Sequence, residues 1–217
     1  METLTENKYS TWYHPYKIAK EYNKKVAYFS MEFGIDQAFN NYSGGLGFLA
    51  GSHMRSGYEL KQNMIGVGML WKYGYYDQAR NDDQTLRTDF NEKHFDFLED
   101  TGIEVEVHLH DNPHVKVRAY ILKPEIFGTV PMYFLSTDVE GNDHISRTIT
   151  NHLYDANEVT RVSQSIVLGI GGAKVVEALG GSEMYHLNEG HGLPAFYYLR
   201  DQGVKKNQMV FTTHTPE

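Results

Sequence analysis

A glycine-rich turn that runs into a predicted helix is the stretch of this sequence best suited to chemistry. It reads Asn-Tyr-Ser-Gly-Gly-Leu-Gly over residues 41–47. Such a turn directs backbone N–H groups and the positive end of a helix dipole toward an anion. Gly44, Gly45 and Gly47 lack side chains that would block close approach. The turn predicts a phosphate or phosphosugar site, although its spacing matches neither the dinucleotide-binding nor the P-loop fingerprint, and a tight strand-to-helix turn is the alternative.

Two loops near the C-terminus place polar side chains directly after predicted strands. The first carries Asn188, Glu189 and His191, and the second carries His214 between two threonines and before a proline. Because ligands of open α/β sheets bind outside the carboxyl ends of the strands, we expect these groups to gather at one site. Asn188 and Glu189 could instead cap and open the next helix, whereas a rigid turn presents His214.

Three histidines in a predicted hairpin raise the separate hypothesis of a metal site. His108 and His110 alternate onto one strand face, Asp111 follows them, and His114 lies across the turn. Histidines on an exposed hairpin are more often solvated than metal-bound, so no metal is expected.

The elements that must position these groups alternate between apolar strands and helices. The pattern predicts an α/β fold with a mixed sheet. The chain is expected to form one domain, residues 1–217, of which 1–24 are a polar N-terminal extension. The predicted strands span 25–30, 64–70, 104–109, 115–122, 130–136, 184–187 and 208–213, and the predicted helices span 46–61, 145–152, 158–179 and 193–201.

The longest predicted helix has one apolar face and several internal glycines. The face is formed by Val159, Val162, Ile166, Ile170, Ala173 and Val176, and it is expected to be core. Gly169, Gly171 and Gly172 each cost about 1 kcal/mol relative to alanine within a helix. Close packing against a neighbouring backbone is the preferred explanation for them, ahead of a ligand contact.

Composition limits the classes of partner. The 217 residues carry a formal net charge of -8, which argues against nucleic acid and acidic membranes. The chain has no cysteine, which excludes disulfides and thiol catalysis, and its first 25 residues contain no apolar run. We therefore expect a cytoplasmic protein with no membrane partner.

Several segments in one order resemble the N-terminal region of the α-glucan phosphorylases. They are the Ala-Tyr-Phe-Ser-Met-Glu-Phe-Gly run at 27–34, the glycine turn, the stretch over 64–78, Tyr154, the helix over 158–179, His-Leu-Asn-Glu-Gly-His at 186–191 and Phe-Thr-Thr-His-Thr-Pro at 211–216. The resemblance implies a Rossmann-like N-terminal domain of a two-domain, GT-B type glycosyltransferase. It implies that the C-terminal lobe is missing and that this chain alone is inactive.

The resemblance also assigns roles to individual residues. Gly44, Gly45 and Leu46 would supply backbone donors to phosphate and sugar, with Gly45 near the cofactor phosphate and Glu32 in the same pocket. His214 would contact the transferred glucosyl unit and is the catalytic candidate. The remaining predicted substrate ligands are Asp155, Asn157, Asn188, Glu189 and His191.

A phosphorylase of this kind uses pyridoxal phosphate and inorganic phosphate to release glucose 1-phosphate from an α-1,4-glucan or maltooligosaccharide. The lysine that holds the cofactor aldehyde belongs to the missing lobe, so no covalent cofactor is expected on this chain. A homodimer is possible for such a protein. The alternative is a stand-alone, non-catalytic glucan-binding or regulatory module, supported by an aromatic content of 13%.

Overall fold

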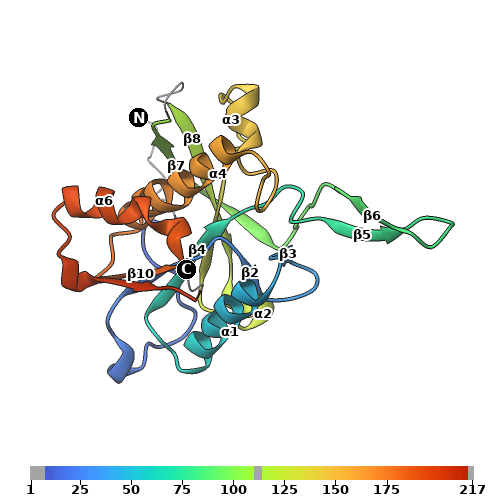
Figure 1. Ribbon diagram of the computed structural model, residues 1–217. Helices are drawn as coiled ribbons and strands as arrows, with labels where there is room; N and C mark the ends of the chain where they lie inside the picture. Colours follow the sequence, from blue (N-terminus) through green and yellow to red (C-terminus); the bar gives the residue numbers. More distant parts are fainter. Residues whose placement is uncertain (1–7, 110–113, 215–217) are drawn as a thin grey trace, which may run out of the picture.

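A mixed seven-stranded sheet forms the centre of the computed structural model, which describes residues 8–109 and 114–214 (Figure 1). The strand order is β11-β10-β1-β4-β9-β8-β7; the first five strands are parallel to one another, and the last two pairings, β9 with β8 and β8 with β7, are antiparallel. The α/β class and the mixed sheet predicted from the sequence are confirmed. The strands are β1 Val26–Phe29, β2 Phe33–Gly34, β3 Asn40–Asn41, β4 Met64–Met69, β5 Asp77–Arg80, β6 Leu86–Asp89, β7 Leu98–Val107, β8 Val115–Leu122, β9 Met132–Ser136, β10 Met184–Asn188 and β11 Met209–Thr212.

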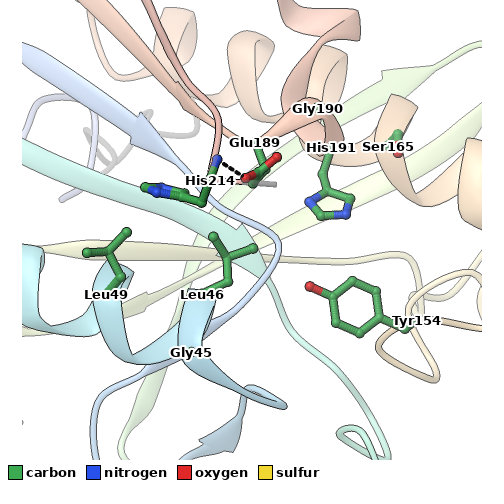
Figure 2. A pocket seen from close by; sticks show the side chains of 9 residues that line it. All are labelled: Gly45, Leu46, Leu49, Tyr154, Ser165, Glu189, Gly190, His191 and His214. Atoms are coloured by element: carbon green, nitrogen blue, oxygen red, sulfur yellow. Dashed lines mark hydrogen bonds between the residues drawn. The ribbon is translucent and has the colours of Figure 1, made fainter. Parts of the chain in front are cut away.

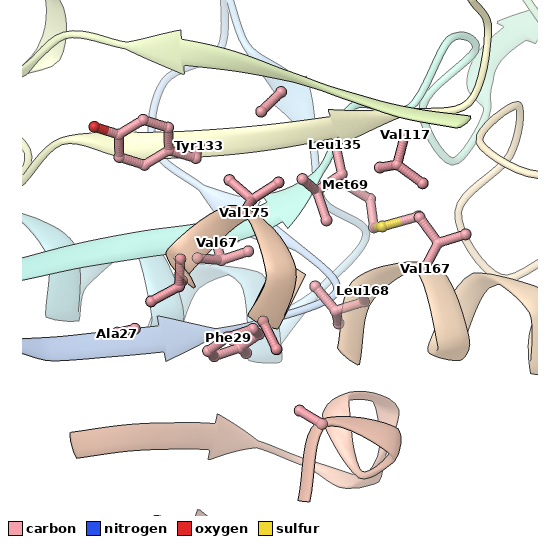
Figure 3. Close-up of a cluster of buried hydrophobic side chains, with 14 of the residues drawn as sticks. Ala27, Phe29, Val67, Met69, Val117, Tyr133, Leu135, Val167, Leu168 and Val175 are labelled. Atoms are coloured by element: carbon pink, nitrogen blue, oxygen red, sulfur yellow. The ribbon is translucent and has the colours of Figure 1, made fainter. Parts of the chain in front are cut away.

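Helices cover both faces of this sheet. The α-helices are α1 Gly45–Glu59, α2 Pro124–Phe127, α3 His144–Thr148, α4 Glu158–Ile166, α5 Gly172–Ala178 and α6 Pro194–Asp201. One face packs against the segment from α4 to α6 through residues such as Phe29, Val67 and Val175 (Figure 3). The opposite face packs against α1 and α2 around Met54 and Phe134. Strand β4 is buried at every position because it lies between two parallel neighbours with helices on both sides.

The long helix departs from its prediction at its start and in its middle. Val159 and Val162 are 75% and 60% exposed, so the predicted apolar face does not belong to the core in the first turns. The face becomes core only toward α5, where Ala173 and Val176 are fully buried against the sheet. A π-helical segment, Val167–Gly171, separates α4 from α5 and shifts the face that each presents.

Two of the helix glycines permit close packing. A Cβ on Gly169 would lie 2.6 Å from the backbone N of Ala195, and one on Gly172 would lie 2.8 Å from the Phe29 ring. Both distances are far below van der Waals contact. The expected packing on a neighbouring backbone is therefore confirmed at Gly169, whereas Gly172 packs against side chains.

The N-terminal segment was expected to be a polar extension, but from Lys8 onward it packs against the domain. Tyr9 is only 3% exposed and belongs to the main core cluster. His14 Nε2 lies 3.1 Å from the Met64 carbonyl oxygen, and Tyr13 donates a hydrogen bond to Glu125. The aromatic rings of this N-terminal segment bury apolar surface, although the residues beside them in the sequence are polar.

Short elements outside the main sheet were not predicted. The β5–β6 hairpin projects from the body of the domain, and β2 pairs with β3 before the glycine turn (Figure 1). The helix predicted over 145–152 ends at Thr148, and β7 begins at Leu98, before the predicted start. Among the described residues, no helix is long and apolar enough to cross a bilayer.

Candidate functional site

A cavity of about 690 Å³ lies where the N-terminus of α1 faces the carboxyl ends of β10 and β11 (Figure 2). Its position is the usual one for ligands of open α/β sheets. Among the described residues that line it there is no lysine and no arginine. The lining residues are Gly45, Leu46, Leu49, Tyr154, Ser165, Glu189, Gly190, His191 and His214.

The glycines of the turn differ in how much space surrounds them. Gly47 N–H and Phe48 N–H donate to the Gly44 carbonyl as α1 begins, so the Gly45 and Leu46 N–H groups precede the first helical hydrogen bonds. A Cβ on Gly45 would meet nothing within 4 Å, as expected for a position that leaves room for a ligand. A Cβ on Gly47 would lie 2.5 Å from the Tyr42 side chain, so Gly47 serves packing instead of ligand approach.

Glu32 lies beneath this turn and is 2% exposed. Its Oε2 accepts hydrogen bonds from the Ser43 N–H at 2.6 Å and from the Gly44 N–H at 3.2 Å. Gly44 was predicted to supply a donor to the ligand, but its N–H donates to Glu32 instead. The donors left at the turn are those of Gly45 and Leu46.

Tyr154, from a separate loop that also lines the cavity, contacts Glu32. Its hydroxyl donates to Glu32 Oε1 at 2.6 Å, and burial together with this carboxylate raises the pKa of Tyr154 far above its ordinary value. The backbone of Tyr154 has a φ of 58°, in the left-handed region that non-glycine residues rarely adopt. Strained backbone of this kind clusters at functional sites.

Asn188 and His214 form a hydrogen-bonded chain at the strand ends. Asn188 is 1% exposed, and its Nδ2 donates to the Ser30 hydroxyl at 3.2 Å. Its Oδ1 lies 3.0 Å from His214 Nε2. Because an amide oxygen only accepts, His214 Nε2 donates this bond, and in the tautomer with its proton on Nε2 the ring has Nδ1 left as an acceptor. Asn188 thus orients His214 and does not cap a helix.

Glu189 also holds the loop that carries His214. One of its carboxylate oxygens accepts from the His214 N–H, as Figure 2 shows, and the other lies 3.4 Å from the Thr213 hydroxyl. The φ of Glu189 is 64°, a second strained position at the same cavity. Glu189 therefore ties the end of β10 to the end of β11.

The structure separates Asp155 and Asn157 from the cavity lining. Asp155 Oδ1 accepts from the Asn157 N–H at 2.8 Å, and Asn157 Oδ1 accepts from the N–H groups of Val159 and Thr160 at the start of α4. Both side chains thus shape the loop and cap the helix. His191 does line the cavity, and its Nδ1 is buried without a hydrogen-bond partner among the described residues.

A second group of histidines lies on the α1 face of the sheet beside the strand ends. The ring centroids of Tyr28 and His186 are 4.8 Å apart, and those of Tyr28 and His53 are 4.9 Å apart. Burial, with smaller effects of His53 and His214, lowers the pKa of His186 to about 4. Its Nε2 lies 2.7 Å from the Thr212 hydroxyl, so a neutral ring is held there by the start of the His214 loop.

The metal hypothesis gains no support from the part of the chain that is described. There, no three histidine, cysteine or acidic side chains are placed to share an ion. The His108 and His114 rings lie 5.8 Å apart, and His114 Nδ1 contacts Glu106 at 3.0 Å. His110 and Asp111 lie outside the described residues.

Four residues that line the cavity were not predicted as site residues. Tyr154 and Gly190 were noted only as parts of motifs, and Ser165 and Leu49 were not singled out. No local pattern distinguishes these residues, because each reaches the cavity through the packing of its helix or loop. Only the glycine turn and the two strand-end loops had recognisable positions in the sequence.

The fold and the site define an α/β domain with a ligand cavity at the carboxyl edge of a mostly parallel sheet. Over most of its length this chain is related to proteins named phosphorylases. It is 34% identical to a glycogen phosphorylase of Mycobacterium tuberculosis, matching 88% of this chain and 25% of that protein. It is also 34% identical to a maltodextrin phosphorylase of Thermococcus litoralis, matching 97% of this chain and 27% of that protein.

An uncharacterized protein of Methanocaldococcus jannaschii is 48% identical over 196 residues, which make up 89% of this chain and 38% of that protein. No family model matches the chain. The chain therefore spans between 25% and 38% of the length of these three relatives. The matched segment of the Methanocaldococcus protein is smaller than those of the two phosphorylases but makes up a larger share of its chain, so that protein is much shorter than they are.

Proposed function

We propose that this chain forms the sugar-binding side of the cleft in an α-glucan phosphorylase, as the N-terminal domain of a GT-B type glycosyltransferase. The observation that carries the proposal is the convergence of three separate segments on one cavity. The glycine turn, the Tyr154 loop and the strand-end loops with Glu189 and His214 all line it. The names of the Mycobacterium and Thermococcus relatives indicate the reaction of the whole protein, which is release of glucose 1-phosphate from an α-1,4-glucan by inorganic phosphate.

The lining residues suit a neutral sugar. His214 Nδ1 is an acceptor for a sugar hydroxyl, and the Gly45 and Leu46 N–H groups are donors. Leu46 and Leu49 supply apolar surface for the ring faces of the sugar. In this proposal Asn188 and Glu189 act through His214, whose ring and backbone they hold.

Pyridoxal phosphate fits this chain only through its phosphate group. Gly45 offers open space and an N–H group to a phosphate oxygen, whereas no lysine of the described residues lines the cavity to hold the aldehyde. When bound, the cofactor supplies a phosphate group that exchanges protons with the attacking inorganic phosphate. The proposal therefore assigns the remaining cofactor contacts to another part of the whole protein.

A glucan-binding module without phosphorolysis is the second candidate. Two observations favour it: the cavity lining has no cation to neutralise phosphate, and the Methanocaldococcus relative is much shorter than the named phosphorylases. Both candidates predict sugar binding by this cavity. They differ in whether phosphate is consumed.

Calorimetric titration with maltoheptaose tests the sugar site. We expect binding by the chain and roughly tenfold weaker binding by His214→Ala, because a hydrogen bond to the sugar is lost. His94→Ala is the matched control, since this histidine side chain is 77% exposed and does not line the cavity. Circular dichroism checks that each variant is folded.

Folded chain that gives no heat at millimolar maltoheptaose would contradict the module, which must bind sugar unaided, and for a phosphorylase it would mean that the sugar site needs the rest of the cleft. The protein of the complete natural reading frame separates them when it is incubated with maltoheptaose, inorganic phosphate and pyridoxal phosphate. Release of glucose 1-phosphate supports the phosphorylase. Sugar binding without that product supports the module.

A further inference from the structure

The Glu32 carboxylate, which lies behind the glycine turn, has hydrogen bonds to both of its oxygens. Its carboxylate accepts from two backbone N–H groups of the glycine turn, from the Ser43 hydroxyl at 3.2 Å and from the Tyr154 hydroxyl. It donates none of these bonds. An acceptor-only carboxylate with both oxygens engaged has little capacity left for a ligand.

The packing around Glu32 leaves no room for a sugar. Glu32 is 2% exposed, and a Cβ on Gly47 would lie 2.9 Å from its Oε2. Glu32 also does not line the cavity, although all of its partners come from segments beside it. Its backbone is held as well, because the Ser30 hydroxyl donates to its carbonyl oxygen at 2.9 Å.

We propose that Glu32 is a positioning residue that binds no ligand and joins the glycine turn to the Tyr154 loop behind the lining of the cavity. The proposal rests on the proposed function in that the positioned cavity is the sugar site. Glu32 accepts from the N–H groups of Ser43 and Gly44, which leaves those of Gly45 and Leu46 for the ligand. Its bond to Tyr154 helps hold a residue whose backbone is strained.

The substitution Glu32→Gln separates these roles because it keeps the size of the side chain. A glutamine has one accepting oxygen and one donating NH2 group, so it cannot accept from both the turn and Tyr154. Amide hydrogen exchange of Ser43 and Gly44 in the ligand-free chain is the direct readout, since these N–H groups donate to Glu32.

We expect Ser43 and Gly44 to exchange about tenfold faster in Glu32→Gln, while amides in β4 keep their rates. Tyr154→Phe removes only the bond from the Tyr154 hydroxyl, so it should accelerate the same two amides less. The double variant should equal Glu32→Gln, because the Tyr154 contribution acts through the carboxylate. Glu140→Gln, at an exposed position outside the helices and strands, is the control and should change nothing.

Unchanged exchange at Ser43 and Gly44 would overturn the proposal, as would acceleration that is uniform along the chain, since uniform loss reports general destabilisation. Loss of maltoheptaose binding in Glu32→Gln with unchanged exchange would also overturn it, because Glu32 would then be a direct ligand. The exchange measurement needs no sugar. It therefore tests Glu32 even if the wild-type chain fails to bind maltoheptaose and the proposed function falls.

Discussion

Gly45 and Gly51 lie on the same helix and meet opposite surroundings. A Cβ on Gly45 would enter open space at the cavity, whereas one on Gly51 would lie 2.1 Å from the Gly34 carbonyl oxygen. Gly51 thus lets α1 pack directly on the backbone of β2, and Gly45 leaves open space at the N-terminal end of α1. One glycine of this helix is therefore required for packing, and the other is proposed to leave room for a ligand.

This difference predicts opposite results for two alanine substitutions. Gly51→Ala should lower the free energy of unfolding by about 3 kcal/mol or more, because the clash is with rigid backbone. Gly45→Ala should leave stability unchanged or raise it slightly, since alanine favours the helix, but should weaken maltoheptaose binding. Urea denaturation and calorimetry measure the two effects. Weakened stability with normal binding in Gly45→Ala would contradict the proposed role of this position.

The partly buried His186 should make the free energy of unfolding depend on pH. Its pKa is about 4 in the folded chain and 6.5 ordinarily, so the unfolded chain binds more protons between these values. Its contribution to stability is complete above about pH 6.5 and is lost as the pH falls toward 4. Burial lowers the pKa of His53 and His191 as well, so they act in the same direction.

Urea denaturation at pH 5 and pH 7 checks this dependence. Wild-type chain should be less stable at pH 5 than at pH 7, and the free energy of unfolding of His186→Asn should fall by less over the same interval. An equal loss in the variant would show that His186 does not contribute. The comparison is between slopes, so a lower absolute stability of the variant does not affect it.

At the scale of elements, the β5–β6 hairpin is separate from the packing of the domain. Its strands pair with each other, residues 81–88 are all exposed, and its base is held by Lys93 Nζ, which lies 2.7 Å from Asp77 Oδ1 (Figure 1). None of its side chains belongs to either core cluster. The hairpin was missed from the sequence because it lacks the alternation of apolar residues that marks a strand packed on a core.

Replacing residues 79–87 by a two-residue Asn-Gly turn tests this independence. We expect the melting temperature to change by no more than a few degrees, because no core surface is uncovered. Differential scanning calorimetry measures it, and the Asp77–Lys93 contact remains in the variant. A large drop would show that the hairpin contributes to the core of the domain.

At the scale of the whole molecule, the cavity lies where three separate segments of the domain meet. The cavity is bounded by α1, the Tyr154 loop and the ends of β10 and β11, and its described lining contains carboxylate, imidazole and hydroxyl groups but no cation. The net charge of -8 provides no general attraction for phosphate. A phosphorolytic reaction therefore needs cationic groups from beyond this cavity, in keeping with the proposal that it forms only the sugar-binding side.

Much of the fold could be predicted because its signals are local. Runs such as Met64–Met69 and Val115–Leu122 are apolar or alternating over their own length, and the structure has strands at both. The exposed start of α4 could not be predicted, since Val159 and Val162 fit the apolar face of the helix in sequence. Whether such a face is covered depends on the path of neighbouring elements, and the π-helical segment changes that path.

The sequence by itself determined most strands of the main sheet, the main helices and the edge of the sheet at which the candidate site lies, because periodicity and glycine turns are properties of neighbouring residues. It also marked Gly45, Glu189 and His214 as site residues, and all three line the cavity. Only the tertiary structure decided which polar atoms remain for a ligand. The carboxylate of Glu32 is hydrogen-bonded to Tyr154 and the glycine turn, and the amide of Asn188 is hydrogen-bonded to Ser30 and His214. Those partners are distant in the chain, and a hydrogen bond depends on positions in space that no local pattern specifies.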